Sequence, residues 1–444
     1  MRNRFLLCAF VGAVFVVTFS AAALDIPLKY QRHADEEQSF RPYGYCGLNK
    51  QTTKPAGEWK LPELVSKQPA YALATLGDRE HLFVLDQQKK KDTFYNRIYF
   101  DANANRDLTD DPILDGEIQR NEGQPYVWVQ FKKVDAQIVV DGKTLPYCFQ
   151  PNVSCYFVDQ DKDVTTENNW MNLNTTLGVS CSYTGQFDLN GQSYDVWLGD
   201  TNGNGRFDNR ISEPSKSVDG PLYFRDDLVF LGTDAKFDYY NGLFLGDKLY
   251  LGGSLFDVQV SITEGKITLN PTAGELATLN LGAETERLML RSKDGAHGIM
   301  AFRPGTSIKV PEGEYSLVGY EVFRNDAKGD RWRMNAAATA DCPAVAARKD
   351  VAAALAFGEP YAPAVQIPEW MRNKLASGHE AEEVSLSFAI RGAGNEQATD
   401  LSRVSGANTD IPMSSKNSSR PQEPTYKIVK ADGEMVAQGA FEYG

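Results

Sequence analysis

Two stretches of this sequence concentrate Asp, Asn and Gly between segments that alternate like β-strands. The first is Ile98 to Asp111, "IYFDANANRDLTDD", and the second is Trp197 to Arg210, "WLGDTNGNGRFDNR". A hard cation such as Ca²⁺ takes six to eight oxygen ligands, and a loop that wraps around it presents side-chain oxygens at alternate positions. Both stretches have this spacing, which predicts calcium binding.

The predicted ligands of the second stretch share one feature, an oxygen at an odd position counted from the first Asp. They are Asp200, Asn202, Asn204, Arg206 through its backbone carbonyl, and Asp208. Gly205 at position 6 permits the sharp turn, and Phe207 at position 8 is expected to point inward. Position 12 is Ile211 instead of a bidentate Glu, so Asp208 or the more distant Glu213 would have to complete the coordination shell.

The first stretch offers the same arrangement with different departures. Its predicted ligands are Asp101, Asn103, Asn105, Asp107 and Asp111. Leu108 takes the inward position 8, and Arg106 stands where a turn glycine is expected. Because position 12 is Pro112, the closing carboxylate must come from Asp110 or Asp111.

A solvated turn without metal is the alternative, since tight turns also use Asn, Asp and Gly for positive φ angles and for side-chain to backbone bonds. The crowding of Asp101, Asp107, Asp110 and Asp111, offset within the stretch only by Arg106, favours the metal, because like charges this close repel. With affinities in the extracellular range, about 10⁻⁴ to 10⁻³ M, such ions would stabilise the structure permanently and would not act as switches.

The pattern D-x-N-x-N-G-x-x-D that begins at Asp200 resembles the calcium loops of EF-hands, dockerins and thrombospondin type 3 repeats. The strand-like residues before each loop argue against a true helix–loop–helix. Over most of the chain, "RIYFDANANRDLTDDP", "VWLGDTNGNGRFDN" and the ending "GAFEYG" resemble features of uncharacterised, signal-peptide-bearing bacterial proteins rich in β-strands. That resemblance implies export and the same loops, and no activity.

The elements that must position these loops are mostly strands. Period-two alternation is interrupted by the turn dipeptides Asp141-Gly142 and Asn190-Gly191, which predict β-hairpins. We therefore predict a mainly β fold: an N-terminal β-rich region over 24–272 with two inserted calcium-type loops, then an Ig-like β-sandwich over 273–444. The shared layout of the two loop regions is consistent with a duplicated β-unit.

Two segments are harder to assign. The alanine-rich stretch 335–358 contains Pro343 and fits either a helix or strands, and the polar stretch 392–424 predicts a long exposed loop.

The N-terminus predicts export. Arg2 and Arg4 precede an apolar run, and small residues ending at Ala23 offer a cleavage site, so 1–23 is interpreted as a signal peptide of a secreted or periplasmic protein. The later sequence has no apolar run of 18 residues, so no transmembrane segment is expected in the mature chain. Five cysteines remain after cleavage, and Cys148 and Cys155 either form a short bridge across a turn or stay unpaired.

Composition and motifs favour binding over catalysis. The net charge of -13 excludes the basic footprint of a nucleic-acid-binding protein, and the four histidines are scattered without metal-ligand spacing. We expect an exported calcium-binding protein that interacts with a glycan or a cell-surface component, with Trp332 and Trp370 as the better surface candidates. The alternatives are an extracellular hydrolase acting on polysaccharide or another polymer, and a purely structural envelope component.

Overall fold

The computed structural model describes residues 23–34, 44–158, 162–214, 220–224, 226–233, 242–377, 383–406 and 410–442. Of these residues 51% lie in strands and 3% in helices, which confirms the predicted mainly β fold. The predicted signal peptide falls outside the described residues, except for Ala23. Within the described ranges, neither helix has the length and hydropathy needed to cross a membrane.

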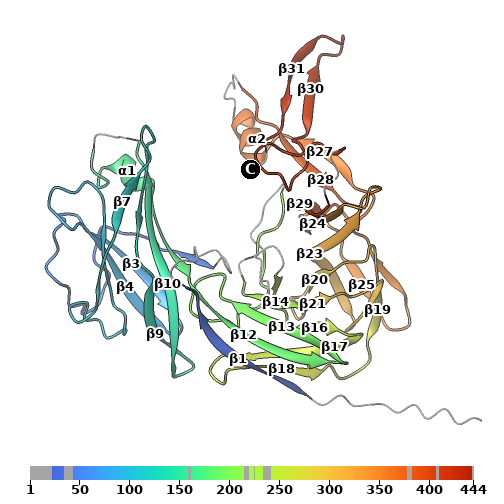
Figure 1. Ribbon diagram of the computed structural model, residues 1–444, viewed down its shortest axis with the longest axis horizontal. Helices are drawn as coiled ribbons and strands as arrows, with labels where there is room; N and C mark the ends of the chain where they lie inside the picture. Colours follow the sequence, from blue (N-terminus) through green and yellow to red (C-terminus); the bar gives the residue numbers. More distant parts are fainter. Residues whose placement is uncertain are drawn as a thin grey trace, which may run out of the picture.

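The N-terminal part, at the left of Figure 1, consists of two sheets. The larger contains β2 (Tyr45–Gly47), β7 (Glu117–Arg120), β8 (Tyr126–Gln130), β9 (Val134–Val140), β10 (Lys143–Tyr156) and β11 (Leu173–Val179). The smaller contains β3 (Ala70–Leu76), β4 (Arg79–Asp86), β5 (Arg97–Phe100) and β6 (Ile113–Asp115). The sheets pack face to face, with Phe100 of β5 against Phe149 of β10 at 5.1 Å between ring centroids.

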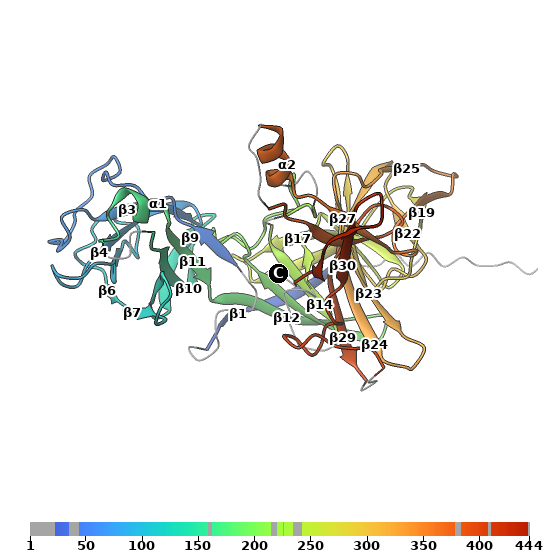
Figure 2. The same ribbon diagram turned by 90° about the horizontal axis from the view of Figure 1, so that it is seen from above.

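A long sheet runs along the lower part of Figure 1 and up its right-hand side. In spatial order it contains β15 (Leu243–Phe244), β14 (Leu228–Gly232), β13 (Gln192–Gly199), β12 (Cys181–Leu189), β1 (Leu24–Arg32), β18 (Lys266–Pro271), β17 (Ser254–Ser261), β16 (Lys248–Leu251), β21 (Gly298–Phe302), β20 (Arg287–Ser292), β23 (Gly313–Asn325), β24 (Arg331–Ala337), β29 (Gln397–Ser405), β28 (Ser387–Arg391) and β27 (Ala362–Gln366), while β25 (Val345–Ala347) pairs with β23. Seen from above in Figure 2, the two-sheet N-terminal part stays to one side of this sheet.

The remaining elements are short. A third layer contains β22 (Ser307–Val310), β19 (Ala277–Leu281) and β26 (Ala353–Leu355), and β30 (Thr425–Val429) pairs with β31 (Met435–Ala440) in a hairpin that projects at the top of Figure 1. The helices are α1 (Glu167–Met171) and α2 (Glu369–Ala376). On α2, Trp370 is 59% exposed, as expected for a surface residue, whereas Trp332 is half-buried and donates from Nε1 to Asp326.

Both predicted hairpin turns are confirmed. Asp141 and Gly142 connect β9 to β10 with φ of 49° and 75°, and Asn190 and Gly191 connect β12 to β13 with φ of 54° and 80°. Two consecutive positive φ angles are what the type I′ hairpin turn requires, and Asn-Gly and Asp-Gly tolerate them best. Local turn chemistry therefore fixes these two registers.

Two hydrophobic cores lie on either side of the predicted boundary near Pro271 to Glu275, with some overlap in sequence. The first core gathers residues from Ile26 to Val318 and the second gathers residues from Tyr250 to Ala347 and beyond. The long sheet continues across the boundary, because β16 pairs in parallel with β21. The two regions thus share one sheet.

One prediction needs correction, and one alternative that the sequence left open is decided. The stretch 392–424 is not a continuous loop, because β29 lies inside it and pairs with β24, burying Asp400 and Ser402. A bridge between Cys148 and Cys155 is excluded, because both residues lie on β10 seven positions apart, about 23 Å along a strand, whereas a disulfide needs Cα atoms within about 7 Å. The alanine-rich stretch, left open between helix and strand, contains β25 and β26.

Candidate calcium-binding loops

The two Asp/Asn loops occupy equivalent places in their hairpins. The first loop connects β5 to β6, and the second follows β13. Their backbones agree at positions 4 and 6, where φ is positive: 55° at Ala104 and 68° at Arg106, against 67° at Gly203 and 79° at Gly205. Arg106 adopts the turn conformation without glycine, and its guanidinium lies 5.3 Å from the centre of the Trp59 ring.

The first Asp of each loop is fully buried and organises the turn. Asp101 accepts hydrogen bonds from the backbone N–H groups of Asn105 at 3.1 Å and Arg106 at 3.2 Å. Asp200 accepts from Gly203 at 2.7 Å and Gly205 at 2.8 Å. In both loops a carboxylate oxygen of position 1 therefore holds the amide of position 6.

Positions 3 and 5 repeat the same bond in both loops. The side-chain oxygens of Asn103 and Asn105 accept the N–H two residues further on, at 2.9 and 2.7 Å. Those of Asn202 and Asn204 do the same at 3.1 and 2.8 Å. These bonds turn the amide oxygens towards the backbone of the loop, as any Asx turn does, so they agree with a calcium loop and with a plain turn.

The prediction for position 8 is confirmed. Leu108 is 1% exposed and packs with Trp59 and Tyr99, and Phe207 is 1% exposed and lies edge-on to Tyr183 at 5.0 Å. Each loop is thus anchored to the core by one apolar side chain.

The acidic residues of the first loop have different partners. Lys60 donates to Asp107 at 2.6 Å, and the Asn105 amide donates to Asp110 at 3.0 Å. Asp111 Oδ2 is buried and has no hydrogen-bond partner among the described residues. Burial, together with the charges of Asp101, Asp110 and Asp107, raises the pKa of Asp111 to about 6.

In the second loop the two carboxylates predicted to close the shell are engaged elsewhere. Arg206 forms ion pairs with Asp208 at 3.1 Å and with Asp78 and Asp141. Glu213, whose side chain is 79% exposed, pairs with Arg291. Neither side chain is therefore directed by its contacts to the centre of the loop.

Asp227, just before β14, is a further carboxylate that lies beside the second loop. It is fully buried, and its Oδ2 accepts the N–H of Asn209 at 2.6 Å. Its Oδ1 is buried without a partner among the described residues. Burial, and then the nearby charge of Asp200, hold the pKa of Asp227 well above the usual range of a carboxyl group.

Strand register explains why these carboxylates meet. Tyr99 of β5 pairs with Ile113 of β6, and two more steps along each strand bring Asp101 opposite Asp111. Gly199 of β13 pairs with Leu228 of β14, and one more step brings Asp200 opposite Asp227. Loop spacing does not predict Asp227, because a strand pairing brings it to the site. The acidic pair Asp226-Asp227 directly before an apolar strand is the one signal in the sequence.

The second loop is also held from several sides. Burial raises the pKa of Asp200, and the Tyr147 hydroxyl on β10 donates to its carboxylate at 2.8 Å. The N–H of Tyr45 donates to the carbonyl of Thr201 at 3.2 Å, and the N–H of Gly77 donates to that of Asn204 at 2.7 Å. The loop therefore contacts both N-terminal sheets as well as the long sheet from which it arises.

In the part of the chain that the structure describes, three or more His, Cys, Asp or Glu side chains nowhere form a group arranged to hold a metal. An ion in either loop would therefore depend on Asn and backbone oxygens beside two carboxylates, which is a donor set that suits a hard cation.

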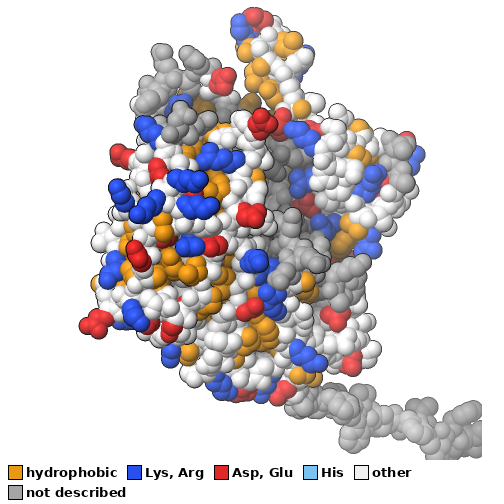
Figure 3. All heavy atoms as spheres, turned by 60° about the vertical axis from the view of Figure 1, so that its left-hand side comes forward, with side chains coloured by type: hydrophobic (Ala, Val, Ile, Leu, Met, Phe, Trp, Pro, Cys, Tyr) orange, Lys and Arg blue, Asp and Glu red, His pale blue; other side chains and the backbone are white. Residues whose placement is uncertain are grey.

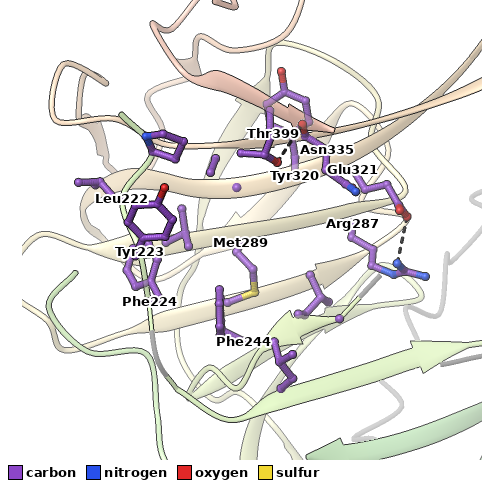
Figure 4. A pocket seen from close by; sticks show the side chains of 18 residues that line it. Leu222, Tyr223, Phe224, Phe244, Arg287, Met289, Tyr320, Glu321, Asn335 and Thr399 are labelled. Carbon is purple, nitrogen blue, oxygen red and sulfur yellow. Dashed lines mark hydrogen bonds and ion pairs between the residues drawn. The ribbon is translucent and has the colours of Figure 1, made fainter. Parts of the chain in front are cut away.

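A separate pocket of about 220 Å³ lies between the long sheet and segment 221–224. Figure 4 shows Tyr223 and Phe224 on one side and the ion pair of Arg287 and Glu321 on the other. The pair measures 3.0 Å, and both side chains are at most 9% exposed. Among the described residues that line this pocket, Glu321 is the one acid, whereas a glycoside hydrolase uses two carboxyl groups.

Where its residues are described, the face shown in Figure 3 does not carry one large patch of a single charge sign. There, Lys and Arg side chains lie among Asp, Glu and hydrophobic side chains.

No family model, curated protein or solved structure matches this chain.

Proposed function

We propose that this chain is an exported calcium-binding protein in which one Ca²⁺ in each Asp/Asn loop stabilises the fold, and that its role is binding at the cell envelope. One observation carries the calcium proposal. In both loops a buried carboxylate oxygen that has no partner among the described residues, on Asp111 and on Asp227, stands opposite a fully buried Asp, Asp101 or Asp200. The hydrogen bonds between side chains and backbone account for a turn. They do not offset the repulsion between the two facing carboxylates of each loop.

A divalent cation supplies that compensation. It would be held by Asp101, Asn103, Asn105 and Asp111 in the first loop, with Asp107 available at position 7. In the second loop the donors would be Asp200, Asn202, Asn204, the Arg206 carbonyl and Asp227, and Asp208 stands nearby, since its charge raises the pKa of Asp227. At a calcium concentration ten times Kd, each ion would add about 1.4 kcal/mol to the free energy of unfolding.

The test is thermal unfolding of the mature protein in calcium and in EGTA. Calcium is expected to raise the midpoint of the wild type. Asp101→Ala and Asp200→Ala should each lose part of that shift, whereas the control Asp188→Ala, an exposed Asp on β12, should keep it. Equal midpoints of the wild type with and without calcium would refute the proposal.

The same structure gives the hydrolase alternative no specific support. Within the described residues, the pocket of Figure 4 has the aromatic wall of a binding site but a single acid, paired with Arg287. A binding role therefore fits the described surfaces better than catalysis.

A further inference from the structure

One face of the larger N-terminal sheet carries exposed aromatic side chains. On β8 and β10 the alternate residues Val127, Val129 and Val153 are buried in the core, so the residues between them project to the opposite face. There Tyr126 is 42% exposed and lies directly across from Tyr156, which is 56% exposed.

Trp128 completes this group. Its ring stacks on that of Tyr126 with centroids 5.8 Å apart and planes 26° apart, and it stands across from the small residue Ser154. We call Tyr126, Trp128 and Tyr156 the aromatic strip. Because the three side chains project from the same face of the sheet, the strip presents ring faces and edges to a ligand lying along that face.

A polar hollow of about 490 Å³ adjoins the strip on the same face. Gln119 pairs with Trp128 across β7 and β8, and Gln130 pairs with Asn152 across β8 and β10. The lining side chains include Gln119, Gln130 and Gln150, with Glu117 and Lys132 at the rim. Amide side chains offer both donors and acceptors, which is what a ligand with many hydroxyl groups needs.

The charges of the hollow cancel. Its charged lining residues, within the part of the chain that the structure describes, are Asp115, Glu117, Lys132 and Lys133, two of each sign. Asp115 is paired with Arg97 at 2.6 Å, and Lys133 donates to the carbonyl of His33 at 3.4 Å. A neutral ligand therefore fits better than an anionic one.

We propose that this face binds a neutral oligosaccharide chain, with sugar rings over the aromatic strip and hydroxyl groups bonded to the glutamines of the hollow. Sugar rings have apolar C–H faces that pack on aromatic rings and a periphery of hydroxyls that needs amide partners. A protein partner fits less well, because the outward strand positions beside the strip on β7, β8, β10 and β11 are mostly Gln, Asn, Ser and Thr, with Glu117 and Gly178, and are not aliphatic. In Figures 1 and 2, β10 lies on the side of the N-terminal part nearer to the long sheet.

The proposal depends on the binding role proposed above, but not on the metal. Its test is calorimetric titration of the mature full chain, in calcium, with cellohexaose, xylohexaose, mannohexaose and laminarihexaose, and with oligogalacturonate as an anionic control. At least one neutral hexasaccharide is expected to bind saturably, and more tightly than the anionic one.

Two variants locate the binding. Trp128→Ala and Tyr156→Ala should each weaken the affinity about tenfold, as the loss of one stacking contact does. Tyr156 is the safer substitution for folding because it is the more exposed. Val436→Ala on β31, where the side chain is 58% exposed, is the control and is expected to bind as the wild type does. Binding of none of the neutral saccharides, tighter binding of the anionic one, or wild-type affinity in both strip variants would overturn the proposal.

The calcium-dependent melting shift, measured on the same samples, separates the two proposals. If calcium still shifts the melting midpoint but no saccharide binds, only the glycan proposal is refuted. If a saccharide binds but calcium does not shift the midpoint, only the calcium proposal is refuted.

Discussion

At the scale of single residues, the informative feature is a carboxyl group whose surroundings oppose its ionisation. Asp111 is half-buried beside three other acids, and burial is the largest cause of its raised pKa of about 6. An unfolded chain would give this group a pKa near 3.9. Between those two values the folded state binds more protons than the unfolded state does.

This difference fixes the sign of a pH dependence. The contribution of Asp111 to the stability of the metal-free protein is complete below about pH 4 and is lost as the pH rises through about 6. We therefore predict that Asp111→Asn, which removes the charge at nearly the same size, flattens the decline in melting midpoint between pH 4.5 and pH 7 in metal-stripped samples. Parallel declines in variant and wild type would contradict it.

The spacing of Asp and Asn in the sequence was enough to predict which side chains organise the two loops. Alternation identified Asp101 and Asp200 as the first residues of the turns, and both are buried and accept backbone N–H groups. It could not predict Asp227, because its place opposite Asp200 depends on the β13–β14 register, set by pairing between segments far apart in the chain. The partner of Glu213, Arg291, was hidden for the same reason, because it lies 78 residues further along the chain.

At the scale of elements, local turn chemistry was the most reliable guide. The hairpins at Asp141-Gly142 and Asn190-Gly191 follow from two residues each. The order of strands in the long sheet does not, since the parallel pairing of β16 with β21 joins segments that no local pattern connects. The strand β29 was missed because its polar residues Asp400 and Ser402 are buried in bonds to each other and to arginines.

The second loop also depends on close contact between elements. Gly205 has φ of 79°, and a Cβ there would lie 2.7 Å from the backbone nitrogen of Gly77, in the β3–β4 turn. Gly123 has a similar φ of 74°, but a Cβ there would meet nothing within 4 Å. Alanine at Gly123 would therefore report the loss of stability from the positive φ alone, whereas alanine at Gly205 would also report the loss from the close contact with Gly77.

We predict that Gly205→Ala destabilises the protein distinctly more than Gly123→Ala does. The control should cost about 1 kcal/mol, for the positive φ alone. The loop variant should cost roughly 2 kcal/mol more, because either Gly77 or the loop must move. Chemical denaturation monitored by tryptophan fluorescence measures both, and equal losses would mean that the contact with Gly77 relaxes freely.

At the scale of the whole molecule, the second loop lies where three sheets meet. It continues from β13 of the long sheet. Its carbonyl groups accept the N–H of Tyr45 on β2, the strand that pairs with β11, and the N–H of Gly77 in the turn between β3 and β4. Figure 1 shows the N-terminal part and the long sheet joined in this region. An ion in this loop would therefore stabilise the junction as well as the turn.

Hydrogen exchange can test this coupling directly. Calcium removal should speed exchange in the peptides that contain Tyr45 and Gly77, since both amides donate to carbonyls of the second loop, while the distant hairpin β30–β31 should exchange at the same rate in both conditions. Asp200→Ala should show the faster exchange even in calcium, and Asp101→Ala, which affects the first loop, should leave Tyr45 protected.

If calcium protects only the peptide that carries Asp200 itself, the ion stabilises a local turn and the sheets are joined by their hydrophobic core alone. Protection that extends to Tyr45 and Gly77 means instead that the order of this junction depends on the electrostatics of two facing carboxylates, Asp200 and Asp227.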